Sequence, residues 1–227
     1  MEKTSNSRFP LVVFDWDGTL MDSVPRIVSC MQKMAQQASL PVPAESAVRD
    51  IIGLSLWVAL ERLFDCYEES EQQQLIAIYR ELYVHTDPTP SPLFSGVIDV
   101  LTELTEQGVQ LGVATGKARQ GLERAWQQTN TGHFFSVSRC ADEANSKPHP
   151  QMLQQILTHT GYTAEQTVMI GDSRYDLQMA KNAGMPSIGV TWGVHDHGQL
   201  DAEQPIAIMQ AIEELPHLLR QVKIASA

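Results

Sequence analysis

The amino-acid sequence predicts an α/β fold, a doubly wound parallel sheet with an all-helical segment inserted after the first strand. From Pro92 onward, short apolar runs alternate with segments of helical periodicity. Such alternation is typical of a parallel sheet covered by helices on both faces. Between residues 21 and 90 the apolar residues instead recur at helical spacing, which favours a helical insert.

The first expected strand is Leu11–Phe14, a continuous apolar run that ends abruptly at Asp15. Its shortness and its β-branched residues favour a buried strand over a helix. Three or four helices should follow in the insert, because helix breakers gather at Pro41–Pro43 and again at Asp87–Pro92.

The second half of the chain should supply the rest of the sheet and its covering helices. We expect strands at Val109–Ala114, Phe135–Cys140, Thr167–Ile170, Pro186–Val190 and Ile206–Ile208, and helices at Val97–Gln107, Ala118–Gln128, Gln151–Thr160, Tyr175–Ala183 and Met209–Leu215. The predicted organisation is then a flexible tail at 1–8, a core formed by 9–20 and 91–227, and a helical insert at 21–90.

Composition narrows the function classes. The chain has 227 residues and a net charge of −11, and this acidic excess disfavours broad electrostatic binding to nucleic acid or to anionic membranes. The three cysteines are widely spaced and no apolar run approaches the length of a membrane span. We therefore expect a cytoplasmic protein, a monomer or weak homodimer, without nucleic-acid or membrane partners.

Polar residues suited to phosphoryl transfer follow the ends of the expected strands. Asp15 and Asp17 come after the first strand, Thr115 after the second, and Asp172 after the TVMI strand, while Lys147 lies in a loop before a helix. In open α/β sheets, ligands bind beyond the carboxyl ends of the strands. The sequence therefore predicts one site that collects these side chains.

The segment Asp15–Leu20 (DWDGTL) is the most specific of these signals. Residues i and i+2 of an extended segment point to the same side, so the carboxylates of Asp15 and Asp17 can reach one substrate. Helix or turn capping explains a lone Asp well but explains this pair poorly. Thr115-Gly116 can offer a hydroxyl and an N–H to phosphoryl oxygens, although a local turn role for Thr115 stays open.

Two further segments complete the set. A cation such as Lys147 is needed where a carboxylate nucleophile meets a phosphate, because the two anions repel each other. In Gly171–Asp176, Ser173 and Asp176 are expected to form a capping box at a helix start. Asp172 then remains as a carboxylate that faces a metal, and Asp176 is expected to orient a ligand or Lys147.

Taken in order, Asp15–Leu20, Thr115-Gly116, Lys147-Pro148 and Gly171–Asp176 resemble the four motifs of haloacid dehalogenase superfamily phosphatases, in the phosphoglycolate-phosphatase-like branch. The resemblance spans nearly the whole core. It implies a Rossmann-like core, and it implies that the insert at 21–90 is an α-helical cap.

The resemblance also implies a mechanism. Asp15 would attack phosphorus to form an aspartyl phosphate, and Asp17 would act as general acid and then as general base. Mg²⁺ would be held by the Asp15 carboxylate, the Asp17 main-chain carbonyl and Asp172. Thr115, Gly116 and Lys147 would bind the phosphate group of the substrate and stabilise the charge on its oxygens.

Substrate choice is expected to depend on the insert. Arg49–Leu56 resembles the cap segment that faces the active site, so Arg49, Gly53 and Leu54 are candidates for contact with the leaving group, an ordinary turn at Gly53 being the alternative. Arg26 and Gly116 stand where phosphoglycolate phosphatases have an acidic residue and an Asn. These departures leave the chemistry intact and weaken the case for glycolate.

The expected function is Mg²⁺-dependent hydrolysis of a small phosphorylated metabolite. A phosphosugar mutase or a pyrophosphatase would use the same chemistry and stays open. A signalling module with a persistent phospho-aspartate is a further alternative. Asp17 beside the nucleophile and the large helical insert favour turnover over signalling.

Overall fold

A computed structural model describes residues 8–221, so most of the tail predicted at 1–8 lies outside the described residues. One six-stranded sheet forms the centre, in the order β3-β2-β1-β4-β5-β6, and every neighbouring pair is parallel. The strands are β1 (Leu11–Phe14), β2 (Gln110–Ala114), β3 (Phe135–Arg139), β4 (Thr167–Gly171), β5 (Ser187–Val190) and β6 (Ala207–Met209). This order is that of Rossmann-like sheets and confirms the predicted doubly wound α/β fold.

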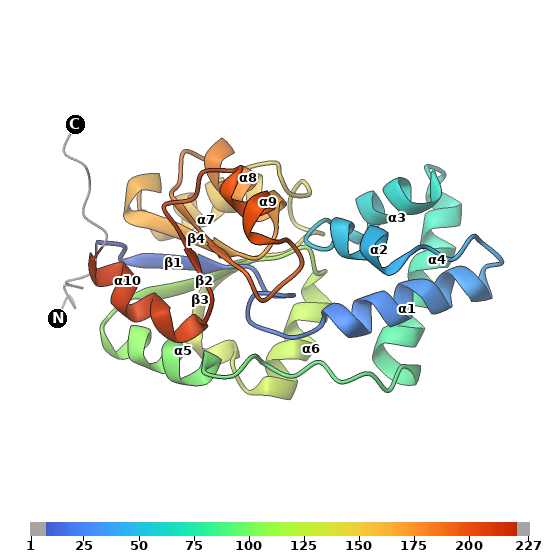
Figure 1. Cartoon of the computed structure of the whole chain (residues 1–227), viewed down its shortest axis with the longest axis horizontal. Helices are drawn as coiled ribbons and strands as arrows, with labels where there is room; N and C mark the ends of the chain where they lie inside the picture. Colours follow the sequence, from blue (N-terminus) through green and yellow to red (C-terminus); the bar gives the residue numbers. More distant parts are fainter. Residues whose placement is uncertain (1–7, 222–227) are drawn as a thin grey trace.

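Helices cover both faces of the sheet (Figure 1). One face packs against α5 (Val97–Glu106), α6 (Arg119–Thr129) and α10 (Leu215–Gln221), and the other against α7 (Gln151–Thr160) and α8 (Arg174–Asn182), with α9 (His197–Asp201) beside β6. The central strand β1 is apolar throughout because both of its faces are buried. Val12 and Phe14 belong to the first hydrophobic layer, whereas Leu11 and Val13 belong to the second.

The helical segment between β1 and β2 has a hydrophobic cluster of its own. It contains α1 (Val24–Gln37), α2 (Glu45–Ile51), α3 (Leu56–Phe64), α4 (Glu69–Glu81) and a π-helix at Leu82–Thr86. Met31, Met34 and Leu60 are buried in this cluster, and Tyr175 of α8 packs into it from the sheet side. Figure 1 shows these helices grouped at one end of the sheet.

The two chain segments that connect the insert to the sheet run side by side. The backbone N–H of Asp22 donates to the carbonyl of Pro92 at 2.8 Å, and that of Phe94 donates to the carbonyl of Leu20 at 3.0 Å. Met21 also forms an isolated antiparallel bridge with Leu93. Entry to and exit from the insert therefore share one narrow, hydrogen-bonded connection.

Most predicted strands and helices of the core end within one residue of the observed ones. The last helix was predicted wrongly, at Met209–Leu215. Met209 ends β6, where it pairs with Val190 of β5, and α10 begins only at Leu215 after a 3₁₀ turn. Met209 is in a strand because it pairs with β5, and the apolar spacing of the local sequence does not indicate this pairing. No helix within residues 8–221 is both long and apolar enough to span a bilayer.

Candidate active site

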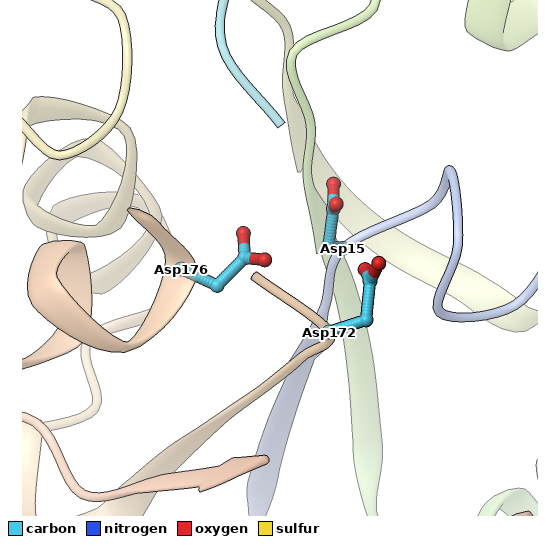
Figure 2. A group of neighbouring side chains, drawn as sticks. All are labelled: Asp15, Asp172 and Asp176. Carbon is cyan, nitrogen blue, oxygen red and sulfur yellow. The ribbon is translucent and has the colours of Figure 1, made fainter. Parts of the chain in front are cut away.

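Three carboxylates meet at the carboxyl ends of β1 and β4. The backbone N–H of Asp15 donates to the carbonyl of Ile170 at 2.9 Å, so the chain after β1 stays paired with β4 for one more residue. This pairing places Asp15 beside Asp172, and the first turn of α8 adds Asp176 (Figure 2). One carboxylate oxygen from each of the three lies within 4.8 Å of the others.

A buried lysine supplies part of the balancing charge. Lys147 Nζ lies 2.7 Å from Asp15 Oδ1 and 2.6 Å from Asp176 Oδ1. Burial nevertheless raises the pKa of Asp15 well above its usual value, and the carboxylates of Asp176 and Asp172 add to this effect against the opposing Lys147. Burial, followed by the charge of Asp176, raises the pKa of Asp172 to about 7. The cluster thus holds more negative charge than one lysine balances.

Asp176 has both carboxylate oxygens engaged by protein groups. Oδ1 accepts from Lys147, and Oδ2 accepts from the backbone N–H of Ser173 at 3.1 Å and from its hydroxyl at 2.6 Å. The backbone N–H of Asp176 is in turn capped by Ser173, so the predicted capping box is confirmed. Asp176 therefore orients Lys147 and the start of α8.

Asp15 and Asp172 are more available for a ligand. Asp172 accepts from the Thr19 hydroxyl at 2.7 Å and from the Val194 backbone N–H at 2.9 Å, one bond on each oxygen. Asp15 is 1% exposed, and apart from the ion pair with Lys147 its oxygens accept no hydrogen bond from the described residues. A buried carboxylate in this state is costly unless a cation or substrate contacts it.

Tight backbone packing holds this arrangement. Gly18 has φ +82°, and a Cβ at this position would overlap the Asp172 carboxylate. The glycine of the Asp15–Leu20 segment is therefore required both for its left-handed backbone and for the close approach of Asp172.

The loop after β2 brings a second group of polar atoms to the site. Thr115 is fully buried, and its backbone N–H donates to the carbonyl of Arg139 at 3.0 Å. A Cβ on Gly116 would lie 2.5 Å from the carbonyl oxygen of Leu54 and 2.7 Å from that of Gly53. The insert segment at Gly53-Leu54 thus lies directly against the Thr115-Gly116 turn.

Lys117 is a site residue that the sequence analysis missed. Its Nζ donates to Asp17 Oδ1 at 2.7 Å and to Oδ2 at 2.9 Å, and Ser23 Oγ donates to Asp17 Oδ1 at 2.5 Å. Burial opposes the charge of Lys117, but the Asp17 carboxylate outweighs it and raises the lysine pKa. The available signal was a lysine directly after Thr115-Gly116 at a strand end.

A cavity of about 410 Å³ lies over these groups, between the sheet and the insert. Its lining includes Asp15, Asp17 and Thr115, as well as the predicted Gly53 and Leu54. Arg49, the third residue expected to contact the leaving group, does not line the cavity. Its guanidinium donates to the carbonyl of Gly193 at 3.0 Å instead.

Two other interpretations of the sequence are wrong, one drawn from the polar segment His195-Asp196-His197 and one from the helical spacing of Trp57 and Phe64. His195 was expected on an exposed loop, but it is 3% exposed because its ring accepts from the Arg174 backbone N–H at 3.0 Å and lies 3.3 Å from Asp50 Oδ1. Trp57 was expected in a core. It is 39% exposed and lines the cavity.

Comparisons with known proteins agree with this geometry. The sequence profile of haloacid dehalogenase-like hydrolases matches residues 12–190. The chain is 36% identical over 212 residues to "Probable phosphatase IndB" of Dickeya dadantii, covering 91% of each protein, and 30% identical over 226 residues to the phosphoglycolate phosphatase of Escherichia coli K12, covering 90% of each.

Solved structures show the same fold. A crystal structure described as a predicted phosphoglycolate phosphatase from Haemophilus somnus superposes with a TM-score of 0.85 at 24% identity, covering 94% of this chain and 99% of that one. A hydrolase from Pseudomonas syringae gives 0.84 at 19% identity, covering 93% and 99%. The chain therefore belongs to the haloacid dehalogenase-like hydrolase family, in which it is similar to the phosphatases.

Proposed function

We propose that the chain is a Mg²⁺-dependent phosphatase that hydrolyses a small phosphorylated metabolite through an aspartyl phosphate on Asp15. One observation carries the proposal. The Asp15 carboxylate is buried, lacks hydrogen-bond donors among the described residues apart from its ion-pair contact with Lys147, and still lines the cavity. That combination suits a nucleophile which a substrate reaches from the cavity side.

The residues present fit a divalent cation. The Asp15 carboxylate, the Asp17 main-chain carbonyl and Asp172 would hold Mg²⁺, an all-oxygen set of the kind this ion prefers. Burial, together with the neighbouring carboxylates, raises the pKa of Asp15 and of Asp172, and a bound cation would offset both effects, which supports this assignment. When bound, the ion would offset the repulsion between these carboxylates and a phosphate.

In the first step, a carboxylate oxygen of Asp15 attacks phosphorus in line. The bond from phosphorus to the leaving oxygen breaks, its electron pair stays on that oxygen, and Asp17 donates the proton that neutralises it. Lys117 and Ser23 contact the Asp17 carboxylate and would fix its direction toward the leaving oxygen.

In the second step, Asp17 takes a proton from a water that attacks the phosphorus of the aspartyl phosphate. The bond between phosphorus and the Asp15 oxygen breaks, which releases phosphate and restores the carboxylate. Thr115, the Gly116 N–H and Lys147 are proposed to bind the phosphoryl oxygens in both steps, where charge gathers in the transition state. Lys147 is held for this role by Asp176, whose own position Ser173 fixes.

We further propose that residues 21–90 act as a cap over a catalytic core formed by 9–20 and 91–227. The separate hydrophobic cluster of the insert and its single paired connection support this division. A cap of this kind would exclude bulk water during the first transfer and admit a water for the second. Contact of Gly53-Leu54 with Gly116 supports a role for the cap in enclosing the substrate.

The reaction class is tested by phosphate release from 4-nitrophenyl phosphate and from a panel of phosphorylated metabolites, with Mg²⁺ and with EDTA. We expect release that needs Mg²⁺ and disappears in Asp15→Asn. Asp201→Asn is the matched control, because Asp201 is an exposed carboxylate on α9 outside the cavity. Activity that survives Asp15→Asn would refute the nucleophile.

A further inference from the structure

The cavity over Asp15 is too large and too apolar on its insert side for a two-carbon leaving group. Its volume of about 410 Å³ lies in the range of roughly 300–1,000 Å³ that holds ligands of drug size. Met31 of α1, Leu54 and Leu56 contribute aliphatic side chains to the lining. Glycolate has two carbons and a carboxylate, so it would leave most of this wall uncovered.

Aromatic side chains from three elements line the same space. Trp57 comes from α3, Tyr79 from α4 and Tyr83 from the π-helix. Tyr79 and Tyr83 stack with ring centroids 5.8 Å apart and an interplanar angle of 27°. Trp57 lines this cavity and keeps 39% of its surface exposed, and large apolar rings left open in a binding site are typically covered by the ligand.

The polar side chains of the lining are distributed unevenly. Asp15, Asp17 and Thr115 form the reaction end of the cavity, and Lys117 beside them is already paired with Asp17. Arg80 on α4 and Arg124 on α6 line the cavity, and neither forms an ion pair within residues 8–221, so these two side chains would suit a leaving group with a carboxylate. The cavity lining therefore leaves two candidates for the leaving group, one with an aromatic ring and one with a carboxylate.

We propose that the leaving group of the natural substrate carries an aromatic ring, which Trp57 and Tyr79 contact while the phosphate lies at Asp15. This inference rests on the proposed phosphatase function, because the ring belongs to the leaving alcohol whose oxygen Asp17 protonates. Most of the cavity lining is apolar or aromatic, and the two arginines without an ion pair, Arg80 and Arg124, cover a smaller part of it, which favours the ring over a carboxylate.

Binding of phosphonates tests the inference without turnover. Calorimetry in the presence of Mg²⁺ would compare 2-phenylethylphosphonate with ethylphosphonate, which differ only by the ring. Burial of a phenyl ring predicts at least about tenfold tighter binding of the phenyl compound. In Trp57→Ala the ratio of the two dissociation constants should fall below about threefold, because the ring loses a main contact. Tyr67→Ala is the control, since Tyr67 is 69% exposed in the insert and does not line the cavity.

Equal affinity for the two phosphonates, or a preference that Trp57→Ala leaves unchanged, would overturn the inference. So would kcat/KM for phosphoglycolate above that for 2-phenylethyl phosphate. Hydrolysis of 2-phenylethyl phosphate and ethyl phosphate tests the phosphatase function separately from the preference for an aromatic ring. If both esters are hydrolysed equally well and Asp15→Asn stops both, the phosphatase function stands and the aromatic assignment fails. If the phosphonate preference holds and neither ester is hydrolysed, the aromatic site stands and the phosphatase function fails.

Discussion

Lys117 donates to both carboxylate oxygens of Asp17, at 2.7 and 2.9 Å. The lysine reaches Asp17 from the loop after β2, while Ser23 contacts the same carboxylate from the start of the insert. Tyr83 packs its ring 4.9 Å from the lysine nitrogen. The proposed acid–base group is thus held jointly by the sheet and by the insert.

Replacement of Lys117 by Met should lower kcat in a way that depends on the leaving group. For ethyl phosphate, whose leaving oxygen needs a proton, we expect kcat to fall about tenfold or more. This is less than the full rate enhancement of general acid–base catalysis, because Asp17 itself remains. For 4-nitrophenyl phosphate the loss should be smaller, because its leaving oxygen needs little protonation. Steady-state kinetics on both substrates measures the difference. An equal loss on both would assign Lys117 to phosphate binding instead.

Replacement of Lys147 by Met should abolish activity and destabilise the fold. Its side chain is fully buried between Asp15 and Asp176, and removal of one partner from a buried ion pair costs about 3–5 kcal/mol. Urea unfolding measures this change. The double variant Lys147→Met with Asp176→Asn should regain part of the stability but no activity. A stable, active Lys147→Met protein would contradict the proposed role of the lysine.

Replacement of Gly116 by Ala should reduce activity more than stability. The new Cβ would approach the carbonyl oxygens of Leu54 and Gly53 to 2.5 and 2.7 Å, so the insert segment must move away from the site. We expect kcat/KM to fall about tenfold or more, since small displacements of catalytic groups are costly. Gly121→Ala is the matched control, because its Cβ would meet only the Lys117 side chain at 3.7 Å or more. Similar kinetics for both variants would refute the contact argument.

Asp87 should make a pH-dependent contribution to stability. Burial opposes its ionisation, but hydrogen bonds from Lys33, Ser29 and Thr89 outweigh burial and hold the Asp87 pKa below its usual value. A carboxyl with a depressed folded-state pKa adds stability above its unfolded pKa of about 3.9, and that contribution is lost as pH falls toward the folded value.

We therefore expect Asp87→Asn to lower the free energy of unfolding by about 1–3 kcal/mol near pH 7. The difference from the parent protein should shrink below about pH 4, as Asp87 itself becomes protonated. Denaturant titrations across this range measure it, with the exposed Asp201→Asn as the control. A difference that is independent of pH would refute the assignment.

The motifs of the core could be read from the sequence because each one follows a strand. In a parallel sheet the carboxyl ends of neighbouring strands share one edge, so Asp15 and Asp172 were expected together and are found together. The capping box at Ser173 is equally local, since its partners lie three residues apart. Strand context and short spacing were sufficient for these predictions.

Features that depend on packing between distant segments could not be read in the same way. The apolar spacing around Trp57 predicts a buried position, because periodicity gives the apolar face of a helix but not what covers it. His195 is buried by contacts with Asp50 of α2, 145 residues away, and with Arg174 of α8, 21 residues away. The pairing of Lys117 with Asp17 spans 100 residues and has no local signature beyond the lysine itself.

Chemical trapping of the phosphorylated enzyme tests whether Asp15 is the nucleophile. The protein would be quenched with acid during turnover with Mg²⁺ and reduced with borohydride, which converts an aspartyl phosphate to homoserine, and the peptides would be mapped by mass spectrometry. We expect homoserine at position 15 in the sample with substrate and Mg²⁺, and no homoserine at this position without substrate. Phosphate release in the same sample without homoserine at position 15, or with homoserine at another position, would contradict Asp15 as the nucleophile.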